Sequence, residues 1–450
     1  MRLAALAVAV LSFVSLPRQD PPSKKVIALK GAKIYTVSGA AIDAGTILIN
    51  GRQITAVGKD IAIPDGATVI DCAGKVVIPG LVDVCSTLYV GESDAPGAPE
   101  QDAYDAFDPF NETWKEVVAA GVTTVYVNPP NRGVANGLGV IVRLTGTTDP
   151  AKLAARRAAA LKFTLGVGAA DSSAPQQRYQ DYRTIKSMFE GAKLYRETSD
   201  KYQKELAEYE VKKKQWDEQQ KQPKIDPPKT DPPKTDPPKA DPARLTEEPK
   251  KPRKPAADRR NEALARALDP ANPLLVRIEA HTTDSIEYAL KLAEEFKLKL
   301  VIEQGTEASR MADVLAKAKV PVLVGPVVIY GLKRVEYLGH STESAALLAK
   351  AGVEVAIGMF PTTRAGHGGP SSSRFLLEAA AIAASKGLTR EQALKAITID
   401  AAKLLGIQAS VGSLEAGKRA DIVILNGEPF DAATRVDRVI VDGETQYERK

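Results

Sequence analysis

Short apolar stretches alternate with amphipathic ones through the middle of the chain. Eight apolar stretches have the length and composition of buried strands, namely 81–88, 123–128, 139–144, 162–167, 274–280, 299–303, 321–325 and 353–358. Apolar residues recur three or four positions apart, as is typical of helices, at 111–120, 283–296, 306–318, 341–351, 371–386 and 389–405. Buried strands separated by amphipathic helices predict an α/β fold with a helix-covered parallel sheet, and about eight strands favour a (β/α)8 TIM-type barrel. An open doubly wound sheet is the alternative, but no GxGxxG motif follows the first strand, which argues against dinucleotide binding.

The two ends of the chain instead show short strands and tight turns. Residues 26–80 contain a hairpin signal at Asn50-Gly51, which predicts a type I′ turn, and a second hairpin is expected at Asp442-Gly443. Isolated hairpins are only marginally stable, so neither end is expected to fold alone. We therefore predict one small β-sandwich domain from residues 26–80 and 408–450, with the barrel at 81–407.

One region interrupts the alternation of strands and helices. Residues 178–222 form a long polar helical pattern, and one face of it carries Tyr195, Tyr202, Leu206 and Tyr209. The pattern runs into KIDPPKTDPPKTDPPKADP, a five-residue repeat of Pro, Lys and Asp. Because proline disrupts helix and sheet interiors, residues 222–257 are predicted to be a disordered, solvated insertion with polyproline II character. A PxxP-type ligand is the functional alternative for this insertion.

The first 20 residues, MRLAALAVAVLSFVSLPRQD, have a basic start followed by an apolar run from Leu3 to Leu16. This run is too short to cross a bilayer and a polar stretch follows it, which favours a signal peptide at 1–20 over a buried helix. No later segment is apolar and long enough to span a membrane, so a periplasmic or secreted protein is expected. The chain has two cysteines, Cys72 and Cys85, which are too few for a disulfide framework and allow at most one bridge.

The charge of the chain limits its partners. The formal net charge is +5, but the basic residues are mixed with acids and prolines and do not form one cluster. Nucleic-acid binding is therefore not expected, because phosphate recognition needs a clustered basic face. A small-molecule ligand and a homo-oligomer remain compatible with the composition.

Four stretches carry a resemblance to a known family: VVIPGLVDV (76–84), GVTTVYVNPP (121–130), AHTTDSIEYALKLAEEFKLKLVIEQGTEASRMADVL (280–315) and LTREQALKAITIDAAKLLGIQASVGSLEAGKRADIVIL (388–425). With the β-domain built from both ends, they resemble the amidohydrolase superfamily, and most closely its imidazolonepropionase-like branch. The resemblance implies a (β/α)8 barrel with a β-sandwich. It also implies one or two zinc-like ions that activate water to hydrolyse C–N bonds, such as those of non-peptide or cyclic amides.

The resemblance further implies metal ligands at set places. These are a His-x-His pair on strand 1, a Lys or Glu on strand 4, His residues on strands 5 and 6, and an Asp after strand 8. The residues at the positions that can be matched are Cys85 and Thr87 on strand 1, His281 on strand 5, Gln304 on strand 6, and Met359 and Phe360 after strand 8. Phe360 stands where the catalytic Asp is expected, and no strand-4 Lys or Glu is assigned.

The number of histidines also argues against the usual dinuclear metal site. The chain has three His residues, His281, His340 and His367, which are too few for a His-rich dinuclear site. A reduced site is the alternative: Glu279 and His281 share one face of a strand, and a Cys85 thiolate would complete a three-ligand set for a single zinc ion. Otherwise Cys85 is a small buried residue with His281 hydrogen-bonded nearby, or a nucleophile that His281 activates.

These observations favour an exported, amidohydrolase-like protein that lacks the usual dinuclear metal site, has no cofactor and acts as a non-catalytic binding protein. The alternative is an active metal-dependent C–N hydrolase with a reduced mononuclear site. A third possibility, an interaction protein that works through the Pro-Lys-Asp insertion, rests on composition alone.

Overall fold

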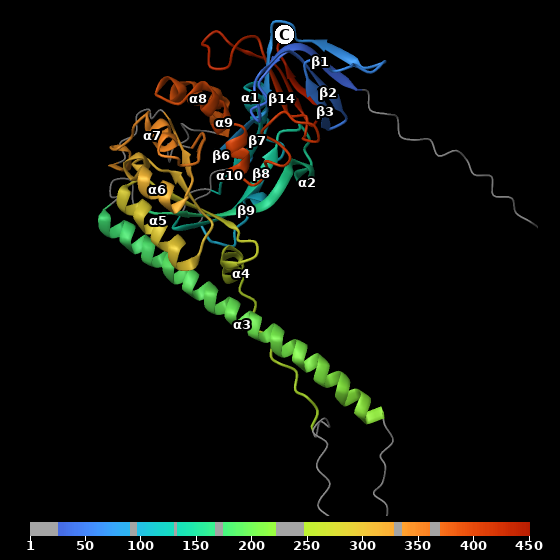
Figure 1. Ribbon diagram of the computed structural model, residues 1–450. Helices are drawn as coiled ribbons and strands as arrows, with labels where there is room; N and C mark the ends of the chain where they lie inside the picture. Colours follow the sequence, from blue (N-terminus) through green and yellow to red (C-terminus); the bar gives the residue numbers. More distant parts are fainter. Residues whose placement is uncertain are drawn as a thin grey trace, which may run out of the picture.

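The computed structural model describes residues 26–90, 97–129, 133–166, 174–221, 247–327, 335–360 and 370–450. The predicted signal peptide, His367 and most of the Pro-rich insertion (222–246) lie outside these residues. Figure 1 shows a barrel with surrounding helices, a β-domain that contains the first and last described strands, and one long helix that projects from the barrel. In the part of the chain that is described, no helix is long and apolar enough to cross a membrane.

The barrel is an eight-stranded sheet whose strands follow one another in chain order. Its strands are β6 (Leu81–Ser86), β7 (Val122–Val127), β8 (Ala135–Arg143), β9 (Ala154–Thr164), β10 (Leu275–Ala280), β11 (Leu300–Gln304), β12 (Val322–Val324) and β13 (Val355–Ile357). All eight predicted strands are present, and the first and last of them approach each other where Met359 N–H donates to Asp83 Oδ1 at 3.1 Å. The nearly closed barrel confirms the predicted fold class.

The expectation of an all-parallel sheet is wrong at one strand. β8 pairs antiparallel with both β7 and β9, whereas the other neighbouring strands are parallel. A parallel crossover needs about a dozen residues or more. The connection between β7 and β8 spans only 128–134, so the chain turns back and runs in the opposite direction.

The predicted helices are present around the barrel. They are α1 (Trp114–Ala119), α5 (Thr283–Phe296), α6 (Ala312–Ala318), α7 (Ser344–Lys350), α8 (Leu376–Ser385), α9 (Arg390–Ala396) and α10 (Ile399–Leu404). Two short helices that the pattern did not indicate are α2 (Pro150–Leu153) and α4 (Arg259–Ala265). The 3-10 helices are η1 (Ala103–Ala106), η2 (Arg266–Leu268), η3 (Ala308–Met311), η4 (Val335–Tyr337) and η5 (Pro370–Phe375). α5 illustrates why these segments form helices on the barrel: Ile286, Ala289 and Leu292 form one buried apolar face against the sheet.

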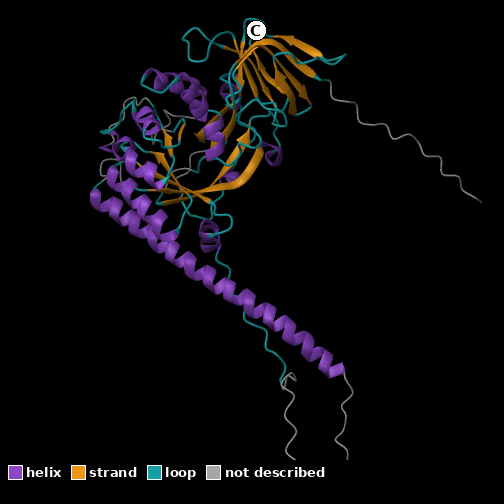
Figure 2. Cartoon of the chain, viewed as in Figure 1, coloured by secondary structure: helices purple, strands orange, loops and turns teal. Residues whose placement is uncertain are grey.

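Both ends of the chain join in the second sheet (Figure 2). Its strands are β1 (Ile27–Ile34), β2 (Ile42–Asn50), β3 (Gln53–Gly58), β4 (Thr68–Asp71), β5 (Val76–Pro79), β14 (Ile422–Leu425), β15 (Val436–Val441) and β16 (Glu444–Glu448). β14 joins the two ends because it pairs antiparallel with β5. Ile54 comes from β3, at one end of the strand order, and Ile440 from β15, next to the other end, yet the two share one apolar core. The sheet therefore folds over its core, as expected for a sandwich.

The two predicted hairpins differ in their turns. At the first, Gly51 has a positive φ of 59°, but Asn50 does not and is the last residue of β2, so the type I′ prediction is wrong. At the second, Asp442 and Gly443 both have positive φ, 54° and 75°. This turn also ties the domain together, because Gly443 N–H donates to Ala420 O at 3.1 Å.

The predicted long polar helix is α3 (Pro175–Lys221). Its first part is anchored to the barrel, where Phe189 packs between Phe163 and Phe296, each ring 5.4 Å away. Its second part projects from the body (Figure 1). The chain from residue 247 returns beside it, since Glu248 pairs with Lys213 at 2.8 Å and Glu262 accepts from Tyr195 at 2.9 Å.

Candidate functional site inside the barrel

The candidate site is formed by side chains that point into the barrel from β6, β9, β10 and β11. Along β10, Val276 and Ile278 pack outward in the core beneath the helices, whereas Arg277 and Glu279 point inward. This is the period-two alternation of a strand, and it extends to His281 directly after β10. The interior therefore receives polar residues from strands whose outer faces are apolar.

Two cations and two carboxylates form a closed ionic network there. Lys162 Nζ lies 3.0 Å from Glu303 and 3.4 Å from Glu279. Arg277 Nε donates to Glu303, and its Nη2 donates to the Val84 carbonyl at 2.8 Å. All four charged side chains are at most 3% exposed.

The strand register explains why the network is connected diagonally. Lys162 lies directly beside Arg277 on the neighbouring strand, and Glu279 lies directly beside Glu303. Like charges at directly opposite positions repel each other. Each charge is instead neutralised by an opposite charge that lies diagonally across on the neighbouring strand or one strand further away. The Arg277 guanidinium also lies 3.8 Å above the Tyr126 ring.

Mutual attraction keeps the network charged. Burial alone would raise the pKa of Glu303, but Arg277 and Lys162 outweigh it and hold that pKa below its usual value. Burial would lower the pKa of Lys162, yet the nearby carboxylates raise it above its usual value. The interior is thus occupied by paired ions.

His281 is held on both sides of its ring. Its Nε2 lies 3.3 Å from Glu279 Oε1, and its Nδ1 lies 2.8 Å from Thr306 Oγ1. The ring meets Tyr337 edge-on at 5.0 Å, and the Tyr337 hydroxyl donates to Gln304 Oε1 at 3.0 Å. The sequence left open that His281 is simply a buried, hydrogen-bonded residue, and its contacts fit that interpretation. Neither ring nitrogen bonds to Cys85.

Cys85 is buried beside the ionic network. Asn128 Nδ2 donates to its sulfur at 3.1 Å and also to Glu303 Oε2 at 3.3 Å. Burial raises the pKa of the Cys85 thiol well above its usual value, and the Glu303 carboxylate adds to the shift. A protonated thiol without a bond to His281 does not fit an activated nucleophile.

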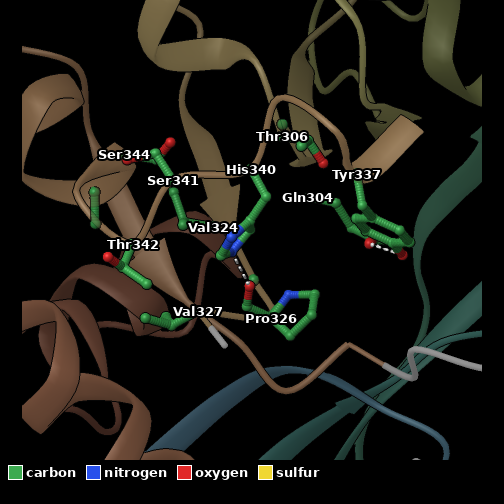
Figure 3. A pocket seen from close by; sticks show the side chains of 13 residues that line it. Gln304, Thr306, Val324, Pro326, Val327, Tyr337, His340, Ser341, Thr342 and Ser344 are labelled. Carbon is green, nitrogen blue, oxygen red and sulfur yellow. Dashed lines mark hydrogen bonds between the residues drawn. The ribbon is translucent and has the colours of Figure 1, made fainter. Parts of the chain in front are cut away.

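A small cavity of about 10 Å³ adjoins this site at the ends of β11 and β12. Figure 3 shows Gln304, Thr306 and Tyr337 on one side of it, and His340, whose Nε2 lies 3.2 Å from the Pro326 carbonyl oxygen, on the other. This volume is about that of one water molecule.

Comparison with known proteins shows similarity to amidohydrolases. The model of the amidohydrolase family matches residues 275–445. The crystal structure of an amidohydrolase from Thermotoga maritima is 27% identical, with a TM-score of 0.75, over 94% of this chain and 100% of that one. Residues 275–445 therefore match the amidohydrolase family, and the chain as a whole shares the fold of a solved amidohydrolase. The imidazolonepropionase-like branch stays a prediction.

Shorter matches connect the chain to curated amidohydrolase-type enzymes. An N-substituted formamide deformylase from Arthrobacter pascens is 36% identical over 83 residues, and a dihydroorotase from Mycobacterium leprae is 41% identical over 62. These matches cover only 15% and 14% of the relatives' own length. The structure of molinate hydrolase, with a TM-score of 0.53 and 17% identity, shares the fold.

The positions where the superfamily pattern expects metal ligands have other surroundings in this chain. Thr87 follows the end of β6 and is only half-buried. Gln304 bonds to Tyr337, and Met359 bonds through its backbone to Asp83. Phe360, at the expected Asp position, packs in an apolar cluster with Val82 and Val84 of β6.

The residues present do not fit a divalent metal ion. The structure brings Glu279 and His281 together and places Cys85 in the same interior, but no three His, Cys, Asp or Glu side chains among the described residues are arranged to hold a metal. The carboxylates already bind Lys162 and Arg277. At about 5 Å and an effective dielectric constant of about 20, each of these cations would repel a dication by roughly 7 kcal/mol.

The sequence analysis missed the cations that define this site. Lys162 and Arg277, with Glu303, stand inside the apolar stretches ALKFTL, LLVRIEA and KLVIEQG. A charged residue within a predicted buried strand was the available signal, because such a residue must be paired. Lys162 also lies on the fourth barrel strand, where no lysine had been assigned.

Proposed function

We propose that this amidohydrolase-like chain is a non-catalytic binding protein that works outside the cytoplasm. One observation carries the proposal: a self-neutralised network of Lys162, Arg277, Glu279 and Glu303 lies in the interior in which the superfamily's metal chemistry would take place. Such a network provides neither free carboxylate ligands nor an activated nucleophile. The apolar run from Leu3 to Leu16 supports the proposed export.

The proposed ligand is a small neutral amide. Beside the network, Arg277 Nη1 and Asn128 Oδ1 are buried without a hydrogen-bond partner among the described residues, one a donor and the other an acceptor. An amide offers the complementary pair, a carbonyl oxygen and an N–H group. A neutral ligand also leaves the paired charges balanced, and the names of the curated relatives point to substrates of this class.

The proposal is tested with the full chain, by hydrolysis assays and thermal unfolding with N-substituted formamides. We expect no hydrolysis with or without added zinc, and a saturable rise in Tm with the ligand that fits. Asn128→Leu should abolish the rise, whereas Gln408→Leu, at an exposed position, should preserve it. Zinc-dependent hydrolysis that disappears in His281→Ala would overturn the proposal in favour of a reduced-site enzyme.

A further inference from the structure

A second cavity, of about 310 Å³, lies at the other end of the barrel, where the barrel meets the β-domain. Thr124 near the start of β7 lines it together with its cross-strand partner Arg143, at the end of the antiparallel β8. Asp442, in the turn between β15 and β16, lines it from the β-domain. The cavity is therefore separate from the candidate site, whose residues lie toward the ends of β7, β10 and β11.

Cations dominate the lining of this cavity. Arg52, Arg143, Lys152 and Arg419 line it, and Asp442 is the one carboxylate among the lining residues. Asp442 is already shared, because it accepts from both Arg143 and Arg419. Lys152 also pairs with Asp149, and Arg143 with Asp421, so the four cations face three carboxylates and one positive charge is left over.

Two of the arginines are positioned to take a ligand. The β3 start and the segment before β14 run side by side, since Ala420 N–H donates to Arg52 O at 2.9 Å and Gln53 pairs with Arg419. The Arg52 side chain is exposed and forms no ion pair with any described residue. Arg419 is 39% exposed, and within the described part of the chain its side chain has only the shared Asp442 as a partner. An oxyanion between them would receive charge-assisted hydrogen bonds from two guanidinium groups.

Two buried polar atoms in lining residues also lack partners. Thr124 Oγ1 and Arg143 Nε are without a hydrogen bond among the described residues. Most buried polar groups are bonded, so these two lining residues carry hydrogen-bonding capacity that the described residues do not use. Arg143 is otherwise fully engaged, with its terminal nitrogens on Asp421 and Asp442.

The remaining lining is apolar. Ile407 and Val411, just after α10, contribute aliphatic side chains together with Ala154 at the start of β9. We propose that this cavity binds a small organic anion, whose carboxylate or phosphate group bonds to Arg52 and Arg419 while its apolar part covers Ile407 and Val411. The site is independent of the proposed function of the barrel interior, because the two share no residue.

The test is isothermal titration calorimetry of the full chain at low salt, with phenyl phosphate as the probe and phenol as its neutral counterpart. Phenyl phosphate should bind and phenol should not. Arg52→Gln should weaken binding of phenyl phosphate by about tenfold or more. Arg183→Gln removes an exposed charge on α3, far from the cavity, and should leave binding unchanged.

Three results would overturn the proposal. These are no binding of phenyl phosphate at about 10 mM, equal binding of phenol, or equal losses in the two arginine variants. If Arg52→Gln fails to fold, Ser410→Glu serves instead, because it places a carboxylate on the cavity lining at an exposed position. Binding of phenyl phosphate to this variant with wild-type affinity would also contradict the proposed site.

Discussion

Glu303 is the residue on which the barrel interior depends most. It accepts from Arg277, Lys162 and Asn128 and is completely buried. Glu303→Gln would leave two buried cations with one carboxylate, and removing one partner of a buried ion pair costs about 3–5 kcal/mol. We expect a loss of this size in the free energy of unfolding, measured with urea.

The matched control for Glu303 is Glu391→Gln, which removes an exposed carboxylate paired with Lys395 four residues away. An exposed pair of this kind contributes about 0.5 kcal/mol or less. Equal effects of the two variants would show that the interior network is not a stabilising unit in this protein.

Asp83 should make stability depend on pH. Burial raises the pKa of its carboxyl to about 6, although the N–H groups of Cys85 and Met359 partly offset the effect. The folded protein therefore binds this proton more tightly than the unfolded chain, so the stabilisation is complete below about pH 4 and is lost as pH rises through about 6. A shift from 3.8 to about 6 corresponds to about 3 kcal/mol.

Urea unfolding between about pH 4 and pH 7.5 measures this effect. The wild type should lose about 2–3 kcal/mol relative to Asp83→Asn over this range. Asp65→Asn changes an exposed position, so its free energy of unfolding should vary with pH as that of the wild type does. A constant difference between the wild type and Asp83→Asn at all pH values would refute the assignment.

At the scale of elements, the local sequence pattern predicted which strands exist better than it predicted the direction in which they run. Each of the eight barrel strands was visible as an apolar stretch bounded by turns, but the antiparallel direction of β8 is set by the short connection 128–134. Matching the barrel to the family pattern located Cys85, Gln304 and Phe360. The pairing of Lys162 with Glu303 depends on the packing of strands distant in sequence, which no local pattern encodes.

α3 should be stabilising only in its first part. Phe189 is completely buried between two other aromatic rings, so Phe189→Ala should cost about 3–5 kcal/mol in the free energy of unfolding. Val211, 59% exposed on the projecting part, is the control, and Val211→Ala should change stability by about 0.5 kcal/mol or less. A large effect of Val211→Ala would mean that the projecting part is packed in solution.

At the scale of the whole molecule, the proposed export can be tested directly. Expressed in a Gram-negative host with residues 1–25 intact, the protein should be recovered outside the cytoplasm, with a mass that lacks the apolar run. Leu6→Arg together with Val10→Arg should keep it inside at full mass, because charges interrupt the run. Full-length wild-type protein in the cytoplasm would contradict the proposal.

The central claim is that this amidohydrolase-like barrel holds an internal salt-bridge network where the superfamily pattern places metal ions. The most direct measurement is elemental analysis of the purified full chain after exposure to zinc and dialysis. The account predicts a folded protein with less than about 0.1 metal ion per chain, unchanged in Cys85→Ala and His281→Ala. Close to one zinc ion per chain, lost in either variant, would contradict it.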